Sequence, residues 1–235
     1  MRNFSHAAKG FTLVELLIST ALLSLILFIA SFSYSLFANN WNKEMGNYKE
    51  TAQFIRNIEL VKRAFQSTVP LVITKQDKKK GLYFVGTNSS ITAVSSYGFF
   101  SELGVIYRIS LEDSIDGSTD KSLVYREAEA NNVLLVDESQ AFQFSHKHVI
   151  IERVESVDIQ FYGWENINAK SLQLSGLGKA EKKWHKKYNA SSSGLFPEQV
   201  RINVRYMSAS GVVETIILNS IFASSAERGL DTPGI

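Results

Sequence analysis

The sequence contains no cysteine. This absence excludes a thiolate nucleophile, a cysteine-based zinc site and a disulfide-bonded scaffold, and it leaves the redox compartment open. Neither sign of charge is in excess, because 25 basic and 23 acidic residues leave a formal net charge of +2. That balance indicates neither a nucleic acid nor an acidic substrate as partner. No Gly-x-Ser-x-Gly elbow, Gly-rich phosphate loop or His-Glu-x-x-His pair occurs, so we expect a non-enzymatic protein without a cofactor.

Charge, glycine and proline are also missing from one long stretch, the 23 residues from Leu16 to Ala38. As a helix this stretch would be about 35 Å long, enough to cross a hydrocarbon core of roughly 30 Å. The short leader before it carries Arg2 and Lys9. By the positive-inside rule the leader stays in the cytoplasm, and the chain after Asn39 is exported.

Two simpler interpretations of this block stay open. A cleaved signal peptide normally has an apolar region of 7–15 residues, which is shorter than this one, and Ser33–Ser35 is a weak cleavage site. A plain single-pass anchor fits the length. However, it leaves Glu15, a carboxylate within the apolar block, unexplained.

The stretch Lys9-Gly10-Phe11-Thr12-Leu13-Val14-Glu15 resembles the class III signal of type IV pilins and type II secretion pseudopilins. The resemblance implies that a prepilin peptidase cuts after Gly10 and that the new N-terminal Phe11 is methylated. It also implies that Glu15, at the fifth mature position, acts in assembly.

Two roles for Glu15 follow from its charge. Cleavage after Gly10 would create an α-amine that is largely cationic near neutrality. Opposite charges ~4 Å apart gain ~4 kcal/mol at an effective dielectric of 20, comparable to the roughly 2.5–3.5 kcal/mol cost of a lone charge at a bilayer centre. Glu15 would then pair with the amine of a neighbouring subunit. Alternatively, it stabilises the N-terminus of its own helix. Both roles are compatible, one before assembly and one after.

The helical pattern continues past the apolar block. Apolar residues at three- and four-residue steps predict an amphipathic helix with one buried face, ended by Ser67–Pro70: Tyr48, Ala52, Ile55, Ile58, Val61 and Phe65. The predicted organisation has four parts: a cleaved leader (1–10), a transmembrane and filament-core helix (11–39), the amphipathic half of that helix (40–69) and a β-rich head (70–235).

After Pro70 the pattern changes to short β-rich runs separated by polar or glycine-containing turns. The predicted strands are Leu71–Thr74, Leu82–Gly86, Val105–Leu111, Ser122–Tyr125, Val133–Val136, Val149–Tyr162, Val200–Tyr206 and Val212–Phe222, the last preceded by a turn at Ser210-Gly211. We therefore expect an α+β, pilin-like fold in which one long N-terminal helix packs on antiparallel β-sheet, and eight strands suggest two sheets.

A second pattern lies in the head: Trp164, Trp184 and then Leu195–Val200, preceded by Ile106–Ile109 and Leu123–Arg126. This order is similar to the minor pseudopilin J of type II secretion systems, although Phe196 here separates the family's adjacent Leu and Pro. A W-type minor pilin of a type IV pilus is the alternative, with roles in assembly priming, adhesion or DNA uptake.

The J-like resemblance implies a structural subunit at or near the tip of a periplasmic pseudopilus that assists the export of folded proteins across the outer membrane. It implies a single-pass protein of the bacterial inner membrane with its C-terminal head in the periplasm. The implied partners are I- and K-like minor pseudopilins, the major pseudopilin, the prepilin peptidase and the inner-membrane assembly platform. Nucleic acid is not among the expected partners.

The most basic stretch is Lys179–Tyr188, in which aromatic residues alternate with lysines. A partner or an anion such as nucleic acid phosphate would contact Lys182, Lys183, Trp184, Lys186 and Lys187. The charge balance of the whole chain favours the simpler interpretation, a solvated loop.

Two clusters resemble metal ligands. Asp113, Asp116 and Asp120 surround a glycine between two strands; such oxygen ligands suit Ca²⁺, and some pseudopilins hold calcium, but Asp-Gly is also an ordinary hairpin turn, which we favour. His146 and His148 would share one face of a strand. No third ligand lies near them in the sequence, so we expect no metal site there.

Overall fold

A computed structural model describes residues 12–75, 78–113, 120–138, 140–141, 143–208 and 211–222. The predicted leader lies outside the described residues. The chain divides into two compact units, Met1–Gln53 and Phe54–Ile235, and each is described by itself. From Leu13 on, the described part of the first unit is helical, and the strands that the structure describes lie in the second unit.

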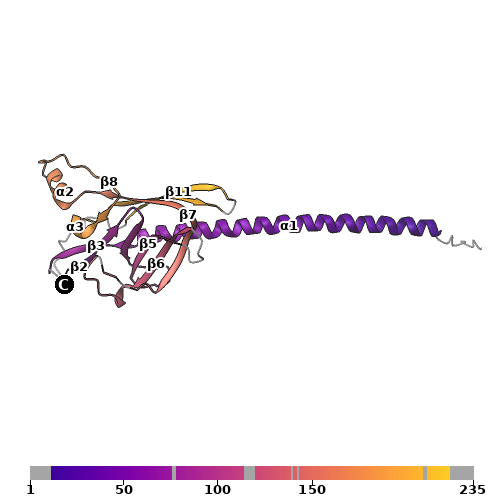
Figure 1. Cartoon of the computed structure of the whole chain (residues 1–235), viewed down its shortest axis with the longest axis horizontal. Coiled ribbons are helices and arrows are strands. Elements are labelled where there is room, and N and C mark those ends of the chain that lie inside the picture. Colours follow the sequence, from indigo (N-terminus) through magenta and orange to yellow (C-terminus); the bar gives the residue numbers. More distant parts are fainter. Residues whose placement is uncertain are drawn as a thin grey trace, which may run out of the picture. The chain divides into compact units, whose positions relative to one another are not determined.

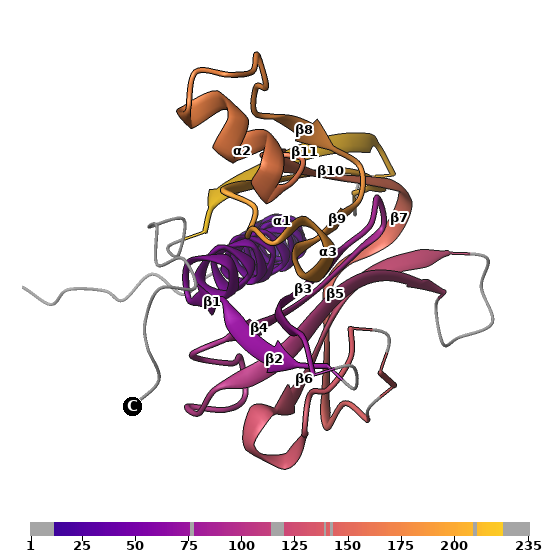
Figure 2. The ribbon, with the colours of Figure 1, turned by 90° about the vertical axis from the view of Figure 1, so that its left-hand side faces the viewer.

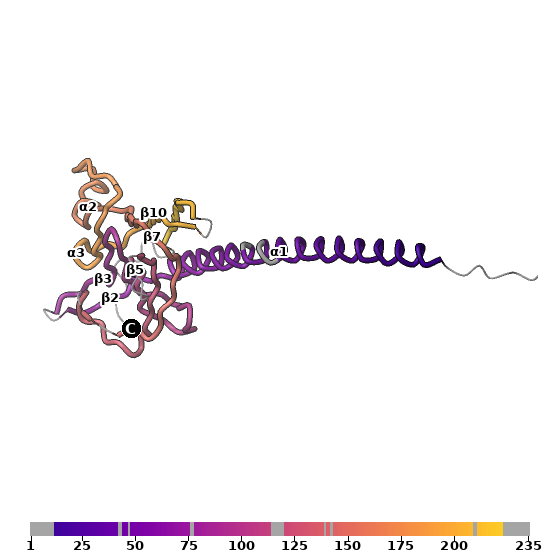
Figure 3. Tube along the Cα trace, turned by 45° about the vertical axis from the view of Figure 1, so that its right-hand side comes forward, coloured from indigo at the N-terminus to yellow at the C-terminus, as the bar shows by residue number. Residues whose placement is uncertain are grey.

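The helix α1 (Leu13–Gln66) runs through the first unit and ends in the second (Figures 1 and 3). As predicted, the helix ends where the Ser67–Pro70 run begins. The Ser67 hydroxyl donates to the Arg63 carbonyl (2.7 Å), and the Thr68 hydroxyl donates to the Ala64 carbonyl (2.7 Å). These side chains satisfy carbonyls of the last turn, and Pro70 follows where a helix cannot continue.

The buried stripe of α1 is shorter than predicted and is shifted by one residue at its start. Phe54 is half-buried, and Ile58, Val61 and Phe65 are buried at steps of four, three and four residues. The predicted members Tyr48 and Ile55 are instead exposed, by 73% and 56%. Ile55 lies about 100° around the helix from Phe54, so only one of the two can face the core.

The sheet has the strand order β11-β10-β7-β6-β5-β4-β3-β2, and every pair in it is antiparallel. These strands are β2 (Leu71–Thr74), β3 (Lys80–Gly86), β4 (Ser90–Ser95), β5 (Val105–Asp113), β6 (Lys121–Glu129), β7 (His146–Gly163), β10 (Gln199–Met207) and β11 (Val213–Ile221). Three short strands pair beside this path: β1 (Thr68–Val69) with β4, β8 (Lys183–His185) with β7, and β9 (Tyr188–Asn189) with β3. The fold is α+β and pilin-like, as predicted.

The strands among the described residues form one hydrogen-bonded sheet of eleven strands, which corrects the expectation of two sheets. The reason is the 18-residue strand β7, whose first part pairs with β6 and whose second part pairs with β10. The pairing shifts register near Arg153, whose φ is +51°, and this irregularity bends the strand. Strands β10 and β11 consequently lie on one side of the end of α1 and β5 and β6 on the other (Figure 2).

Seven of the eight predicted strands coincide with observed strands, but Val133–Val136 does not. It follows the short 3₁₀ helix η1 (Ala130–Asn132) as irregular chain. Leu135 is buried in a small cluster with Ile73, while Leu134 is 80% exposed. The apolar residues there anchor irregular chain rather than a strand, because Leu135 is buried in this cluster and Val133 packs against it.

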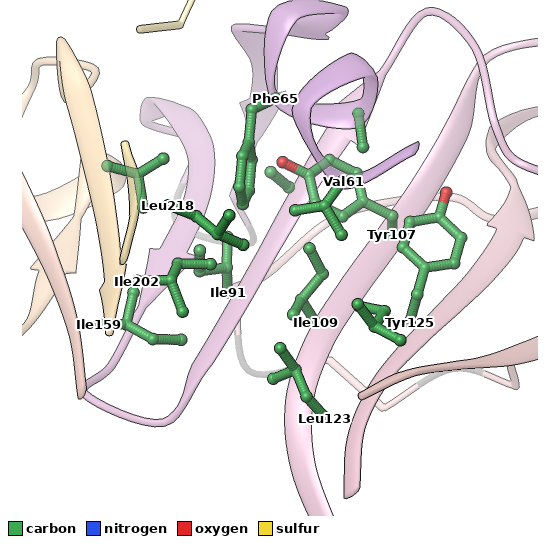
Figure 4. Packing of buried hydrophobic residues seen from close by; sticks show 14 of the residues in the cluster. Val61, Phe65, Ile91, Tyr107, Ile109, Leu123, Tyr125, Ile159, Ile202 and Leu218 are labelled. Atoms are coloured by element: carbon green, nitrogen blue, oxygen red, sulfur yellow. The ribbon is translucent and has the colours of Figure 1, made fainter. Parts of the chain in front are cut away.

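The main core surrounds the end of α1. The sheet has two arms, one formed by β10, β11 and the second part of β7 and the other by β5 and β6. Val61 and Phe65 lie between side chains from both arms (Figure 4). On one side lie Ile159, Ile202 and Leu218, and on the other Tyr107, Ile109, Leu123 and Tyr125. Two short helices complete the head: α2 (Ile167–Leu174), capped by Asn166, and α3 (Ala190–Ser193), capped by Asn189.

Candidate assembly site

The first turn of α1 is closed by reciprocal hydrogen bonds between Thr12 and Glu15. The Thr12 amide and the Thr12 hydroxyl each donate to Oε2 of Glu15 at 3.0 Å. The Glu15 amide in turn donates to Oγ1 of Thr12 at 3.3 Å. This is a capping box, in which a hydroxyl and a carboxylate three residues apart satisfy backbone donors that the helix leaves unpaired.

The capping box explains how a carboxylate is held next to a strongly apolar surface. Its neighbours Leu13, Val14 and Leu16 are 60–81% exposed. Negative charge in the first turn is also favoured by the helix dipole. Among the described residues only Thr12 bonds to the carboxylate, and it uses Oε2.

The processing residues predicted from the sequence, Gly10 and Phe11, lie outside the described residues. Of the predicted assembly residues, only Glu15 can therefore be placed. Its bonds to Thr12 agree with the second role considered for it, stabilisation of the helix N-terminus. The first role, pairing with an amine, needs a second chain and stays a prediction.

The helix that follows is suited to an apolar environment. The described residues contain one helix long and apolar enough to cross a membrane, α1, and the side chains of its apolar window are not buried. Two hydroxyls within this window bond back to their own helix: Thr20 donates to the Leu17 carbonyl and Ser24 to the Thr20 carbonyl, both at 2.9 Å. Hydroxyls satisfied in this way can face lipid or a neighbouring helix at little cost.

Comparison with known protein families agrees with this site. The model described as "Prokaryotic N-terminal methylation motif" matches residues 5–31, which include the capping box and the first two thirds of the apolar stretch. No characterised protein matches the chain significantly. The motif and the fold together support the class of type IV pilin-like proteins and pseudopilins. This class implies processing by a prepilin peptidase and assembly with other pilins into a structural, membrane-anchored polymer.

In the basic stretch predicted as a contact surface, two of the lysines form ion pairs with carboxylates of the head. Lys182 lies 2.7 Å from a carboxylate oxygen of Glu198, and Lys183 lies 3.0 Å from one of Glu165. Lys186 and Lys187 are exposed. The Trp184 ring is covered by the guanidinium of Arg201, 4.2 Å from the ring centre. The five residues therefore do not form one uniform basic surface, because two of the lysines already have carboxylate partners.

The two metal candidates lie in different parts of the head. Asp113 ends β5 opposite Lys121, and Asp120 precedes β6, but Asp116 lies outside the described residues. The calcium prediction therefore stays a prediction. His146 and His148 share one side of β7 and both contact the ring of Phe100. The described residues hold no cluster of three metal-ligating side chains.

One buried carboxylate, Glu127 on β6, was not predicted. It is 1% exposed and accepts three hydrogen bonds, from the Phe99 amide (2.6 Å), the Phe100 amide (2.9 Å) and the Tyr125 hydroxyl (2.8 Å). A Cβ on Gly98 would lie 2.5 Å from its Oε2, so a side chain at this position would have to displace the Glu127 carboxylate. Burial and the nearby carboxylate raise the pKa of Tyr125. Glu127 fixes the loop between β4 and β5, which is a structural role.

Proposed function

We propose that this protein is a minor pseudopilin, a structural subunit at or near the tip of the periplasmic pseudopilus of a type II secretion system. Its work would be assembly rather than chemistry, and it would assist the export of folded proteins across the outer membrane. After removal of residues 1–10, the protein would remain a single-pass protein of the inner membrane with its head, 70–235, in the periplasm.

The capping box at the start of the apolar helix carries this proposal. Processing after Gly10 would place the new amine of Phe11 directly before Thr12, whose side chain holds Glu15 in place. A carboxylate that is fixed by one oxygen presents the other to an approaching amine at little further entropic cost. Assembly would then bring Glu15 of one subunit to the N-terminus of the next.

The head supports a role as a contact module. Its interior is filled by the aromatic core, and the buried carboxylate Glu127 is bonded to the loop before β5. The J-like sequence pattern of the head is the reason that we propose a position at or near the tip. Its Phe196 packs against Phe84 with ring centres 4.9 Å apart, so the residue that departs from the family pattern contributes to the core.

The partners that we propose are I- and K-like minor pseudopilins, the major pseudopilin and the assembly platform. A minor pilin of a type IV pilus is the alternative within the same class. Deletion of the protein from its bacterium distinguishes the two. Loss of protein export with surface pili retained supports the pseudopilin, whereas loss of pili with export retained supports the pilin.

A further inference from the structure

The two edges of the sheet differ strongly in how well they are protected from pairing with a strand of another chain. The edge strand β2 has four residues, follows Pro70, and is followed in the sequence by Lys75 and Lys78–Lys80. The opposite edge, β11, has nine residues, and no proline, glycine or lysine occurs within it. Short length, proline and lysine are the features by which proteins keep sheet edges from pairing with other chains. β11 lacks all three.

The exposed face of β11 carries three large apolar side chains. Val213, Ile217 and Ile221 are exposed by 39%, 58% and 62% and lie at steps of four residues on one face of the strand, with the exposed Thr215 and Asn219 between them. The other face, by contrast, contributes Leu218 to the core. Among the described residues, β11 pairs only with β10, so the backbone groups on its outer side have no strand partner there.

The charge on β11 also has a simple pattern. Its only charged residue is Glu214, whose Oε2 accepts a hydrogen bond from the Tyr206 hydroxyl at 2.9 Å. This exposed carboxylate at the start of the strand disfavours an anionic lipid surface. A lipid surface would also leave the outer N–H and C=O groups of the strand unpaired, whereas another strand would pair them.

We propose that β11 is a docking edge for a β-strand from the head of a neighbouring pilin-like subunit. The incoming strand carries apolar side chains at alternate positions, facing Val213, Ile217 and Ile221, and a basic residue near Glu214. This inference rests on the proposed function, because it names a partner surface for the same assembly. It commits to strand addition as the mode of contact.

The size of this contact decides where it must be tested. A nine-residue strand is about 30 Å long, and such a narrow contact is small compared with the ~1,200 Å² of a stable interface. It therefore needs the high local concentration that a shared membrane anchor supplies. The experiments accordingly use the full chain in its native membranes, with the filament assembled.

The first test maps the contact. Because the chain has no cysteine, Ile217→Cys introduces a single thiol, and Val72→Cys does the same at the β2 edge, where Val72 is 46% exposed. Each variant is labelled with a thiol-reactive benzophenone and illuminated in membranes. We expect Ile217→Cys to give an adduct with a second subunit that itself has a methylated N-terminus, attached within a segment of alternating apolar residues. We expect Val72→Cys to give none.

The second test measures the strength and the mode of contact. Ile217→Lys places a lysine on the unprotected edge, and Val72→Lys is the matched control on the protected one. We expect at least a tenfold loss of co-purified partner subunit for the first and no change for the second. Hydrogen exchange of the peptide 212–222 should slow for about half of its amides on assembly, because alternate N–H groups of an edge strand point outward.

The outcomes separate the inference from the proposed function. Retention of the partner by Ile217→Lys, unchanged exchange of β11, or an adduct with lipid, a helix or another copy of this chain would overturn the docking edge alone. An unprocessed N-terminus in the wild-type protein would overturn the proposed function together with the edge. Since Ile217 is exposed, unchanged thermal unfolding of Ile217→Lys establishes that its head is folded.

Discussion

Asn57 on α1 joins the helix to β7 through His148. Nε2 of His148 lies 2.9 Å from Oδ1 of Asn57, and Nδ2 of Asn57 donates to the carbonyls of Ile150 (3.0 Å) and Val149 (3.4 Å). Since Nδ2 faces two acceptors, Oδ1 must accept, and Nε2 of His148 must carry a proton. The end of α1 is thereby fixed to the strand that connects the two arms of the sheet.

This relationship predicts a pH dependence of stability. Burial and the nearby Arg56 lower the pKa of His148 below its usual 6.5. The unfolded chain therefore takes up the second ring proton of His148 more readily than the folded chain does. The stabilisation by neutral His148 is complete above about pH 6.5 and is lost as the pH falls through the folded pKa. We expect the thermal midpoint of His148→Gln to depend less on pH between 5 and 7 than that of the wild type. Parallel curves for the two proteins would contradict this assignment.

Removal of the buried carboxylate should destabilise the head. Glu127→Gln replaces one acceptor oxygen with an NH₂ group. This donor would face the backbone N–H of Phe99 or Phe100, which then loses its acceptor. We expect a loss of roughly 2–3 kcal/mol in the free energy of unfolding, measured by denaturant titration. Glu129→Gln, two residues further along β6, is the control and should change stability by less than about 0.5 kcal/mol. Equal effects of the two variants would refute the anchoring role of Glu127.

The ion pair of Glu112 predicts a second, more acidic transition. Arg126 donates two bonds to Glu112 (2.7 and 2.8 Å), which together with Lys147 lower the pKa of this carboxyl below 4.5. Its stabilisation is present above about pH 4.5 and is lost as the pH falls through the folded pKa. Glu112→Gln should cost roughly 1 kcal/mol at pH 7, and this cost should shrink as the pH falls through the folded pKa. The exposed Glu102→Gln is expected to have no effect across the same range, and a cost for Glu112→Gln that does not change with pH would exclude an electrostatic origin.

The aromatic core predicts a large packing effect. Phe84 is fully buried, and its ring centre lies within 4.9–5.6 Å of those of Phe161, Phe196 and Phe222. Phe84→Ala should lower the free energy of unfolding by about 3–5 kcal/mol through lost burial and a cavity. Phe100→Ala, at a half-exposed position, should cost much less. Similar costs at both positions would show that the core can collapse around the smaller side chain.

The parts of this structure that follow from local interactions could be predicted from the sequence. The helix, its end at Ser67–Pro70 and seven strands follow from periodicity and turn residues within a few positions. Stabilisation of the helix N-terminus by Glu15 was one of two roles considered, whereas its hydrogen-bond partner Thr12, three residues away, was not singled out. By contrast, β4 was missed, since it is buried on both faces and shows no alternation.

The features that were missed depend on contacts between distant residues. Glu127 accepts bonds from a loop that begins almost thirty residues earlier, and no local pattern distinguishes it from an exposed strand carboxylate. The partner of Lys182 is Glu198, 16 residues away, so the basic stretch looked more uniform in the sequence than it is in the structure. The single sheet likewise depends on the bend near Arg153 and on pairing along all of β7.

Glu15 provides the test of assembly that is closest to the site. Glu15→Val should leave leader removal intact but reduce incorporation into filaments at least tenfold, because the amine of the neighbouring subunit loses its partner. Ser19→Ala, one helical turn further on, is the matched control and should assemble normally. Incorporation of Glu15→Val at the wild-type level, measured by cross-linking to neighbouring subunits in native membranes and immunoblotting, would remove the carboxylate from the assembly mechanism.

The most direct test of the whole account is the mass of the N-terminal peptide of the protein from its native membranes. A chain that begins at Phe11 and is heavier by one methyl group is the predicted result. A chain that still carries residues 1–10, or one trimmed near Ser35, would contradict the assignment to the pilin-like class.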